Sequence, residues 1–118
     1  MNKAVQLVSE ELYISIPEYC VTGEPVGSFF GHHWYIACDQ QIDSATLAKL
    51  IDEKLCALND DYAVERKSAL KEVKLTILKE NTFLSFMESR GKVGGQHKFP
   101  RVLKGTVLTD WKAFILNQ

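Results

Sequence analysis

The sequence predicts a small α+β domain, in which helices pack on a mostly antiparallel sheet in the order α-β-β-α-β-α. Two segments carry this expectation. Residues 43–59 repeat their leucines with the 3.6-residue period of an amphipathic helix, and residues 72–80 alternate apolar and polar side chains as a half-buried strand does. The length of 118 residues suits one domain, residues 1–118, that can bury a core without disulfides.

The first third of the chain predicts a helix followed by a hairpin. Residues 3–12 place their alanine and valines on one helical face. Residues 13–21 and 32–39 are rich in β-branched and aromatic side chains, which favours two paired strands. Pro17 restricts the first strand to an edge, an end or a bulge. The glycine-rich residues 22–31 are expected to form the loop between them.

The middle of the chain predicts the longest helix and a third strand. Asp43 or Ser44 can cap the helix of residues 43–59. Residues 60–71 are expected to form a helical turn or a loop, and residues 72–80 the strand.

The last third predicts the helix that completes this order and, beyond an irregular basic segment, one further helix. Asn81 or Thr82 can cap a short helix over residues 81–91, and Gly91 can end it. Thr109 can cap a last helix that carries a tryptophan and a phenylalanine.

The composition indicates a soluble globular protein, with 46% hydrophobic and 25% charged residues. No apolar run approaches the roughly 18 residues of a membrane span, and the N-terminus lacks a signal-peptide core. Cys20, Cys38 and Cys56 are odd in number and form no CxxC pair. Free thiols in a cytoplasmic location, and no membrane partner, are therefore expected.

Positive charge is concentrated in one segment of a slightly acidic chain. Residues 89–109 hold five Lys or Arg and no acid, while the remaining residues hold nine basic and 15 acidic side chains, so their formal net charge is −6. A local basic patch on an acidic body points to a local anionic ligand and against general nucleic-acid binding.

The centre of this segment, RGKVGGQHKFPR, suits an anion. Gly94 and Gly95 permit positive φ angles and a close approach of backbone N–H groups to a ligand. Lys98 adds a movable point charge, and Arg101 adds a planar fork that matches carboxylate or phosphate. A solvated basic hairpin without a ligand is the alternative, because the spacing is not that of a phosphate-binding P-loop.

Histidines and aromatic residues offer weaker candidates. His32 and His33 begin a predicted strand and should point to opposite faces, and His97 has no partner at ligand spacing, so no metal site is expected. Phe99 and Tyr62 could stack on nucleic-acid bases. Core or packing roles explain these two aromatic residues better at a pI near 6.3.

The run TFLSFMESRGKVGGQHKFPR resembles the C-terminal domain of the auxin-responsive acyl acid–amido synthetase family. That family's pattern is a Thr-Phe helix start, a basic residue before glycine, a short loop, and Gln-aromatic/His-Lys-x-Pro-Arg. LNDDYAVER resembles the family's Leu-Asn-x-x-Tyr-x-x-x-Arg helix end, and GHHWYIACD its Gly-His-aromatic strand. The matching positions are Thr82, Phe83, Arg90, Gly91, Gln96, His97, Lys98, Pro100, Arg101, Asn59, Tyr62 and Arg66.

The resemblance implies one half of an adenylating enzyme. In this superfamily a large N-terminal domain binds ATP, Mg²⁺ and the acyl acid, and the small C-terminal domain closes over it as a lid. The enzyme then transfers the acyl group to an amine. By motif position Lys98 is the lysine that reaches the substrate carboxylate and the α-phosphate. Gln96, Arg101 and the Gly94–Gly95 turn would shape the loop, and Arg90 would contact phosphate.

The chain departs from the family in lacking the ATP-binding and acyl-binding motifs of the large domain. It is therefore expected to be inactive alone, either as an excised domain or as a natural short protein. The His33–Trp34 pair and the length of the Gly94–Gly95 turn resemble bacterial members of the family. The alternative function is a stand-alone, non-catalytic module that binds an anionic partner through residues 90–104.

Overall fold

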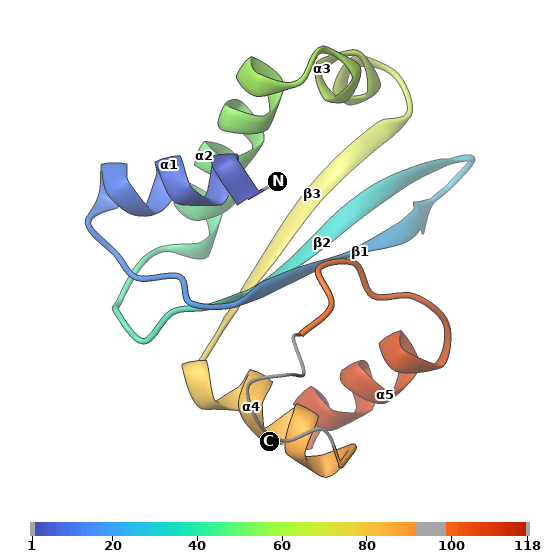
Figure 1. Ribbon diagram of the computed structural model, residues 1–118. Coiled ribbons are helices and arrows are strands. Elements are labelled where there is room, and N and C mark those ends of the chain that lie inside the picture. The colour runs from blue at the N-terminus through green and yellow to red at the C-terminus, as the bar shows by residue number, and fades with distance from the viewer. Residues whose placement is uncertain (1, 92–98, 118) are drawn as a thin grey trace.

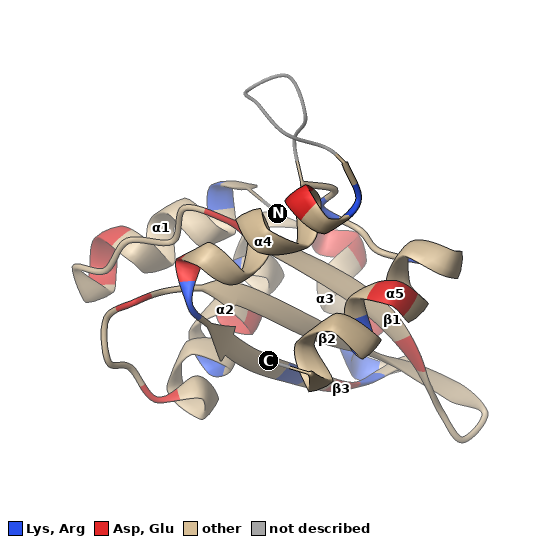
Figure 2. Ribbon diagram, turned by 90° about the horizontal axis from the view of Figure 1, so that it is seen from below, with Lys and Arg blue, Asp and Glu red and all other residues tan. Residues whose placement is uncertain are grey.

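The computed structural model describes residues 2–91 and 99–117. A central sheet has helices on both faces, with α1, α2 and α3 on one side and α4 and α5 on the other (Figure 1). The view in Figure 2 shows α4 and α5 in front of the sheet. The elements are α1 Asn2–Leu12, β1 Tyr19–Val26, β2 Phe29–Ala37, α2 Ser44–Leu58, α3 Asp60–Lys67, β3 Leu70–Leu78, α4 Glu80–Ser89 and α5 Gly105–Leu116.

The sheet has the strand order β1-β2-β3 and is mixed. β1 and β2 pair antiparallel as the predicted hairpin, whereas β2 and β3 pair parallel. The parallel pairing arises because the chain crosses from β2 to β3 through α2 and α3, which returns it to the same end of the sheet. The α+β class is confirmed, but the sheet is mixed where the sequence predicts a mostly antiparallel one.

The hairpin turn is much shorter than the predicted loop of residues 22–31. β1 and β2 stay paired until Val26 faces Phe29, so the turn consists of Gly27 and Ser28 alone. Gly27 has a φ of +60°, the conformation that a two-residue hairpin turn requires at its first position. Pro25 is tolerated inside β1 because β1 is an edge strand.

The predicted strand over residues 13–21 is wrong in its first two-thirds. Residues 13–18 alternate in exposure but belong to none of the described strands, although the Glu18 carbonyl accepts from the Ala37 N–H of β2. The side chain of Gln40 binds this segment instead, accepting from the Ser15 N–H at 2.5 Å and donating to the Tyr13 carbonyl at 3.3 Å. Periodicity alone does not distinguish an extended segment held by one side chain from a paired strand.

Alternation along β1 and β2 supplies both halves of the core. Trp34 and Ile36 face α1 and α2, while Tyr35 and Ala37 face α4 and α5. Each sheet face is therefore covered by its own set of helices. No helix in the described part of the chain has the length and apolar character needed to cross a membrane.

The helix limits follow local chemistry at two positions that the sequence predicts. Asp43 caps α2 by accepting from the Thr46 N–H at 2.9 Å. Gly91 ends α4 with a φ of +74°, and its N–H donates to the Glu88 carbonyl. The sequence predicts a helical turn or a loop over residues 60–71. Residues 60–67 form the helix α3.

Two predicted helix starts are wrong. α4 begins at Glu80, one residue before Asn81, because Asp39 from beyond β2 accepts the Glu80 N–H at 2.9 Å. α5 begins at Gly105, four residues before Thr109, because Val107 and Leu108 also pack into the core beneath it.

Candidate functional site

We call residues 90–104 the basic loop, and its end is attached to the edge of the sheet. Residues 99–103, called the strap below, run beside β1 (Figure 1). The Val21 N–H donates to the Arg101 carbonyl at 2.8 Å, and the Leu103 N–H donates to the Val21 carbonyl at 3.0 Å. These two bonds form a parallel bridge that extends the sheet by one short segment.

The strap is also anchored by a buried aromatic side chain. Phe99 is 5% exposed and packs against Phe83, Phe86 and Trp111, at ring-centroid distances of 4.8, 5.9 and 5.1 Å. Leu103 at the other end of the strap is 2% exposed. Phe99 is thus a core residue, so the strap has a fixed base.

Arg101 turns its guanidinium back onto the start of β1. Its Nη1 atom donates to the Glu18 carboxylate and to the Tyr19 carbonyl, the latter at 3.1 Å. The guanidinium carbon lies 4.2 Å from the centre of the Tyr19 ring, which is cation–π geometry. Burial lowers the pKa of Arg101, but an arginine stays protonated at neutral pH.

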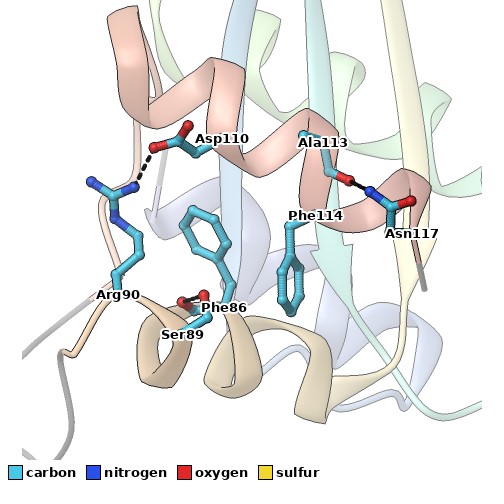
Figure 3. A pocket seen from close by; sticks show the side chains of 7 residues that line it. All are labelled: Phe86, Ser89, Arg90, Asp110, Ala113, Phe114 and Asn117. Carbon is cyan, nitrogen blue, oxygen red and sulfur yellow. Dashed lines mark hydrogen bonds and ion pairs between the residues drawn. The ribbon is translucent and has the colours of Figure 1, made fainter.

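The beginning of the basic loop is held by a second ion pair. Arg90 Nη1 lies 2.6 Å from Asp110 Oδ2, which ties the end of α4 to α5 (Figure 3). The guanidinium carbon also lies 5.6 Å from the centre of the Phe86 ring. These residues border a groove of about 470 Å³ between the two helices, lined by Phe86, Ser89, Arg90, Asp110, Ala113, Phe114 and Asn117.

The structure therefore separates the predicted site residues into two groups. Lys98, Gln96, Gly94 and Gly95 lie outside the described residues, as does His97, so their roles stay predictions. Arg90 and Arg101 are described, and both are paired with acids of the domain. Two of the five positive charges in residues 89–109 are thus balanced inside the domain.

The sequence gives no local signal for Glu18 and Asp110, the acids that pair with Arg101 and Arg90 at the two ends of the basic loop. Glu18 is 83 residues from Arg101, and Asp110 is 20 residues from Arg90. No local pattern joins such pairs, because the contacts depend on how strands and helices are arranged in space. The only sequence signal is that the basic segment contains no acid, so any acid that pairs with its arginines comes from elsewhere in the chain.

His32 and His33 lie on opposite faces of β2, as the sequence predicts. His33 stacks on Tyr35 with ring centroids 4.3 Å apart, and its Nδ1 and Nε2 atoms lie 3.2 Å from Glu24 Oε1 and 2.8 Å from Thr76 Oγ1. Burial lowers the pKa of His33, although Glu24 opposes this effect. His32 packs on the other face, beside Tyr62.

The residues of LNDDYAVER brace the corner between α2 and α3. The Asn59 side chain caps α3 by accepting from the Tyr62 N–H at 3.0 Å. The Tyr62 hydroxyl and Arg66 Nε both donate to Asp52 Oδ1, at 2.7 and 2.9 Å. Tyr62 packs in the cluster on the face of the sheet opposite Phe99, so the two aromatic residues form no joint base-stacking surface.

A comparison of the sequence with models of known protein families identifies the domain. The family model described as "GH3 family C-terminal domain" matches residues 1–106. The chain belongs to the GH3 C-terminal domain family. The match covers the three-stranded sheet, four of the helices and the strap, so it includes every described contact at the ends of the basic loop except those made by α5.

Two solved structures share the fold of this GH3 domain. One is "GH3.15 acyl acid amido synthetase", with a TM-score of 0.70, and the other is "AtGH3.15 acyl acid amido synthetase in complex with 2,4-DB", with a TM-score of 0.65. Each is 18% identical and covers 94% of this chain, which spans 23% and 22% of theirs. None of the curated proteins matches the chain.

Proposed function

We propose that this GH3 domain is the mobile C-terminal domain of an ATP-dependent acyl acid–amido synthetase. Such an enzyme activates a small carboxylic acid as its acyl adenylate and then transfers the acyl group to an amine. An N-terminal domain of the same polypeptide would bind ATP, Mg²⁺ and the acid. The family match and the shared fold support this proposal, and the isolated domain is expected to be inactive.

Lys98 is the proposed adenylation residue. Attack of a carboxylate on the α-phosphate brings two anions together, so a cation placed between them lowers the barrier where negative charge builds up. A lysine suits this position because its ammonium is compact and its stem can reach across a domain boundary. Placing the lysine on a domain that moves would make its arrival a gated step of the reaction.

The observation that carries the proposal is the anchoring of the strap directly after Lys98. Phe99 is buried among three aromatic rings, and Arg101 and Leu103 are hydrogen bonded to β1. A rigid base suits a loop that must present one charge at a defined place, because transition-state stabilisation depends on positioning. A merely solvated basic hairpin has no need of such an anchor.

The test is Lys98→Ala in an enzyme that joins this domain to its N-terminal domain. Acid-dependent ATP–pyrophosphate exchange should fall at least about tenfold, which corresponds to about 1.4 kcal/mol of barrier. Lys49→Ala is the matched control, since it removes the same charge from the exposed surface of α2. Exchange that is unchanged in Lys98→Ala would overturn the assignment.

A further inference from the structure

The contacts of Arg101 single out one acid that the proposed function does not assign. Glu18 lies just before β1, and its carboxylate accepts the Arg101 Nη1–H bond. We propose that Glu18 is a positioning residue of the enzyme, which acts through Arg101 to hold the strap on the edge of β1. This inference rests on the proposed function, because it gives the strap a part in adenylation.

Glu18 is itself fixed to the sheet and not to the loop. Its carbonyl accepts from the Ala37 N–H of β2 at 2.9 Å, and its carboxylate also accepts from the Tyr19 N–H at 3.3 Å. The side chain is 27% exposed, so the sheet holds it at a defined place and partly shields it. An acid placed in this way is a fixed reference point for the arginine that reaches it.

Arg101 connects this reference point to the strap through two different groups. Its carbonyl accepts from the Val21 N–H, and its guanidinium returns over the Tyr19 ring to Glu18. The main chain and the side chain of Arg101 therefore both bind the same short segment, residues 18–21. Neutralising Glu18 would leave a partly buried guanidinium without its counter-charge, and the strap would separate from β1 more often.

The effect on the reaction should appear in turnover and not in substrate binding. The N-terminal domain would bind ATP and the acid, so a loosened strap leaves their sites intact. The strap follows directly on Lys98 in the chain, and catalytic groups lose much of their effect when they are misplaced by about 1 Å. Glu18→Gln should therefore lower kcat for adenylation and leave the KM for ATP nearly unchanged.

The first experiment measures strap attachment in the full 118-residue chain, without any assay of activity. The Leu103 amide donates to Val21 across the strap bridge, so its hydrogen exchange reports separation of the strap. Glu18→Gln should speed this exchange at least about threefold, as expected for the loss of a partly exposed ion pair. Amide exchange in β2 should stay unchanged.

The matched control is Glu11→Gln. Glu11 forms an ion pair with Lys54 at 2.9 Å between α1 and α2, on the opposite face of the sheet from α4 and α5. The Glu11→Gln substitution removes the same charge from the same residue type without touching the strap. Equal exchange of the Leu103 amide in Glu18→Gln and Glu11→Gln would overturn the inference.

The second experiment measures ATP–pyrophosphate exchange in the two-domain enzyme. Glu18→Gln should lower kcat at least about threefold, and Glu18→Asp, which keeps the charge, should restore part of the loss. In a double-mutant cycle, Glu18→Gln should cost little more once Arg101→Gln is present, because Glu18 acts through Arg101. Additive losses, or an unchanged kcat in Glu18→Gln, would overturn the positioning role.

These outcomes separate the inference from the proposed function. Normal turnover in Lys98→Ala overturns the function, whatever Glu18 does. Reduced turnover in Lys98→Ala together with normal turnover in Glu18→Gln leaves the function standing and overturns the inference. Reduced turnover in both Lys98→Ala and Glu18→Gln, with Leu103 exchange faster in Glu18→Gln and not in Glu11→Gln, supports the function and the inference together.

Discussion

Phe99 packs edge-on against Trp111, with ring centroids 5.1 Å apart and ring planes at 71°. Phe99 belongs to the strap at the end of the basic loop, and Trp111 belongs to α5. Both rings are buried, and they share the neighbours Phe83 and Phe86 on α4. The strap is therefore anchored in an aromatic core and not merely attached to the surface.

Phe99→Ala should lower the free energy of unfolding by about 3–5 kcal/mol, because it removes a buried ring and leaves a cavity among three others. Urea unfolding followed by tryptophan fluorescence would measure the change. Leu84→Ala is the control on α4, since Leu84 is 59% exposed and its loss should cost far less. A similar small loss in both variants would contradict the packing of Phe99.

Tyr13→Gly should stabilise the domain, although it removes an aromatic ring. Tyr13 ends α1 with a φ of +54°, and its side chain is 89% exposed. The left-handed conformation costs a residue with a Cβ about 1–2 kcal/mol, and the added entropy cost of glycine is about 0.5–1 kcal/mol. A net gain of about 0.5–1 kcal/mol is expected in thermal unfolding.

Tyr13→Ala provides the control for this gain. Alanine keeps the Cβ and therefore the strain, so its stability should stay close to that of the unmodified chain. Equal stabilisation by alanine and glycine would show that the exposed ring, and not the backbone conformation, lowers stability at Tyr13.

Stability should fall as the solution is acidified below pH 6.5, and His33 should contribute to the fall. Burial lowers the pKa of folded His33 below the ordinary value of 6.5, against the opposing effect of Glu24. The unfolded chain then binds the proton more readily than the folded one. The stabilisation is complete above pH 6.5 and is lost as the pH falls through the lower, folded pKa.

Urea unfolding of the chain and of His33→Gln between pH 7.5 and about pH 5 would test this linkage. The charges facing His33 are Glu24, Lys74 and Lys112, and they are the same in both proteins. The variant should show the weaker pH dependence, although His32 also has a lowered pKa and remains in place. An identical slope in the two proteins would exclude a contribution from His33.

Tyr62→Phe should destabilise the domain by about 1–3 kcal/mol, because the Tyr62 hydroxyl donates a hydrogen bond to the charged Asp52. Turnover per folded enzyme should stay normal, since this contact braces α2 against α3 on the face of the sheet away from the strap. Tyr13→Phe, at an exposed hydroxyl, is the control for stability. A loss of turnover without a loss of stability would assign Tyr62 a role in the site.

Local chemistry made several parts of the fold predictable. Asp43 and Gly91 act as the predicted cap and stop, because each depends on contacts within a few residues of chain. The helical period of α2 predicted its buried Leu47, Ile51 and Leu55, although Leu58 is exposed, and the alternation in β3 predicted its half-buried face. The motif around Lys98 led to the family, which the match over residues 1–106 confirms.

Helix starts and strand limits were less predictable, because distant groups decide them. Asp39 sets the first residue of α4, and the Gln40 side chain takes hydrogen bonds that a paired strand would otherwise supply to residues 13–18. The parallel pairing of β3 depends on the route of the chain across the sheet. None of these is encoded within a short window of sequence.

The sequence by itself determined the class of fold, the family, and the position of a basic loop with a lysine in its motif. Only the tertiary structure decided that Arg101 belongs to Glu18 and Arg90 to Asp110. The physical reason is that the sequence gives the number and order of the charges, whereas an ion pair depends on which groups lie close together in space. The acids that neutralise a loop come from whichever strand or helix the fold places beside it.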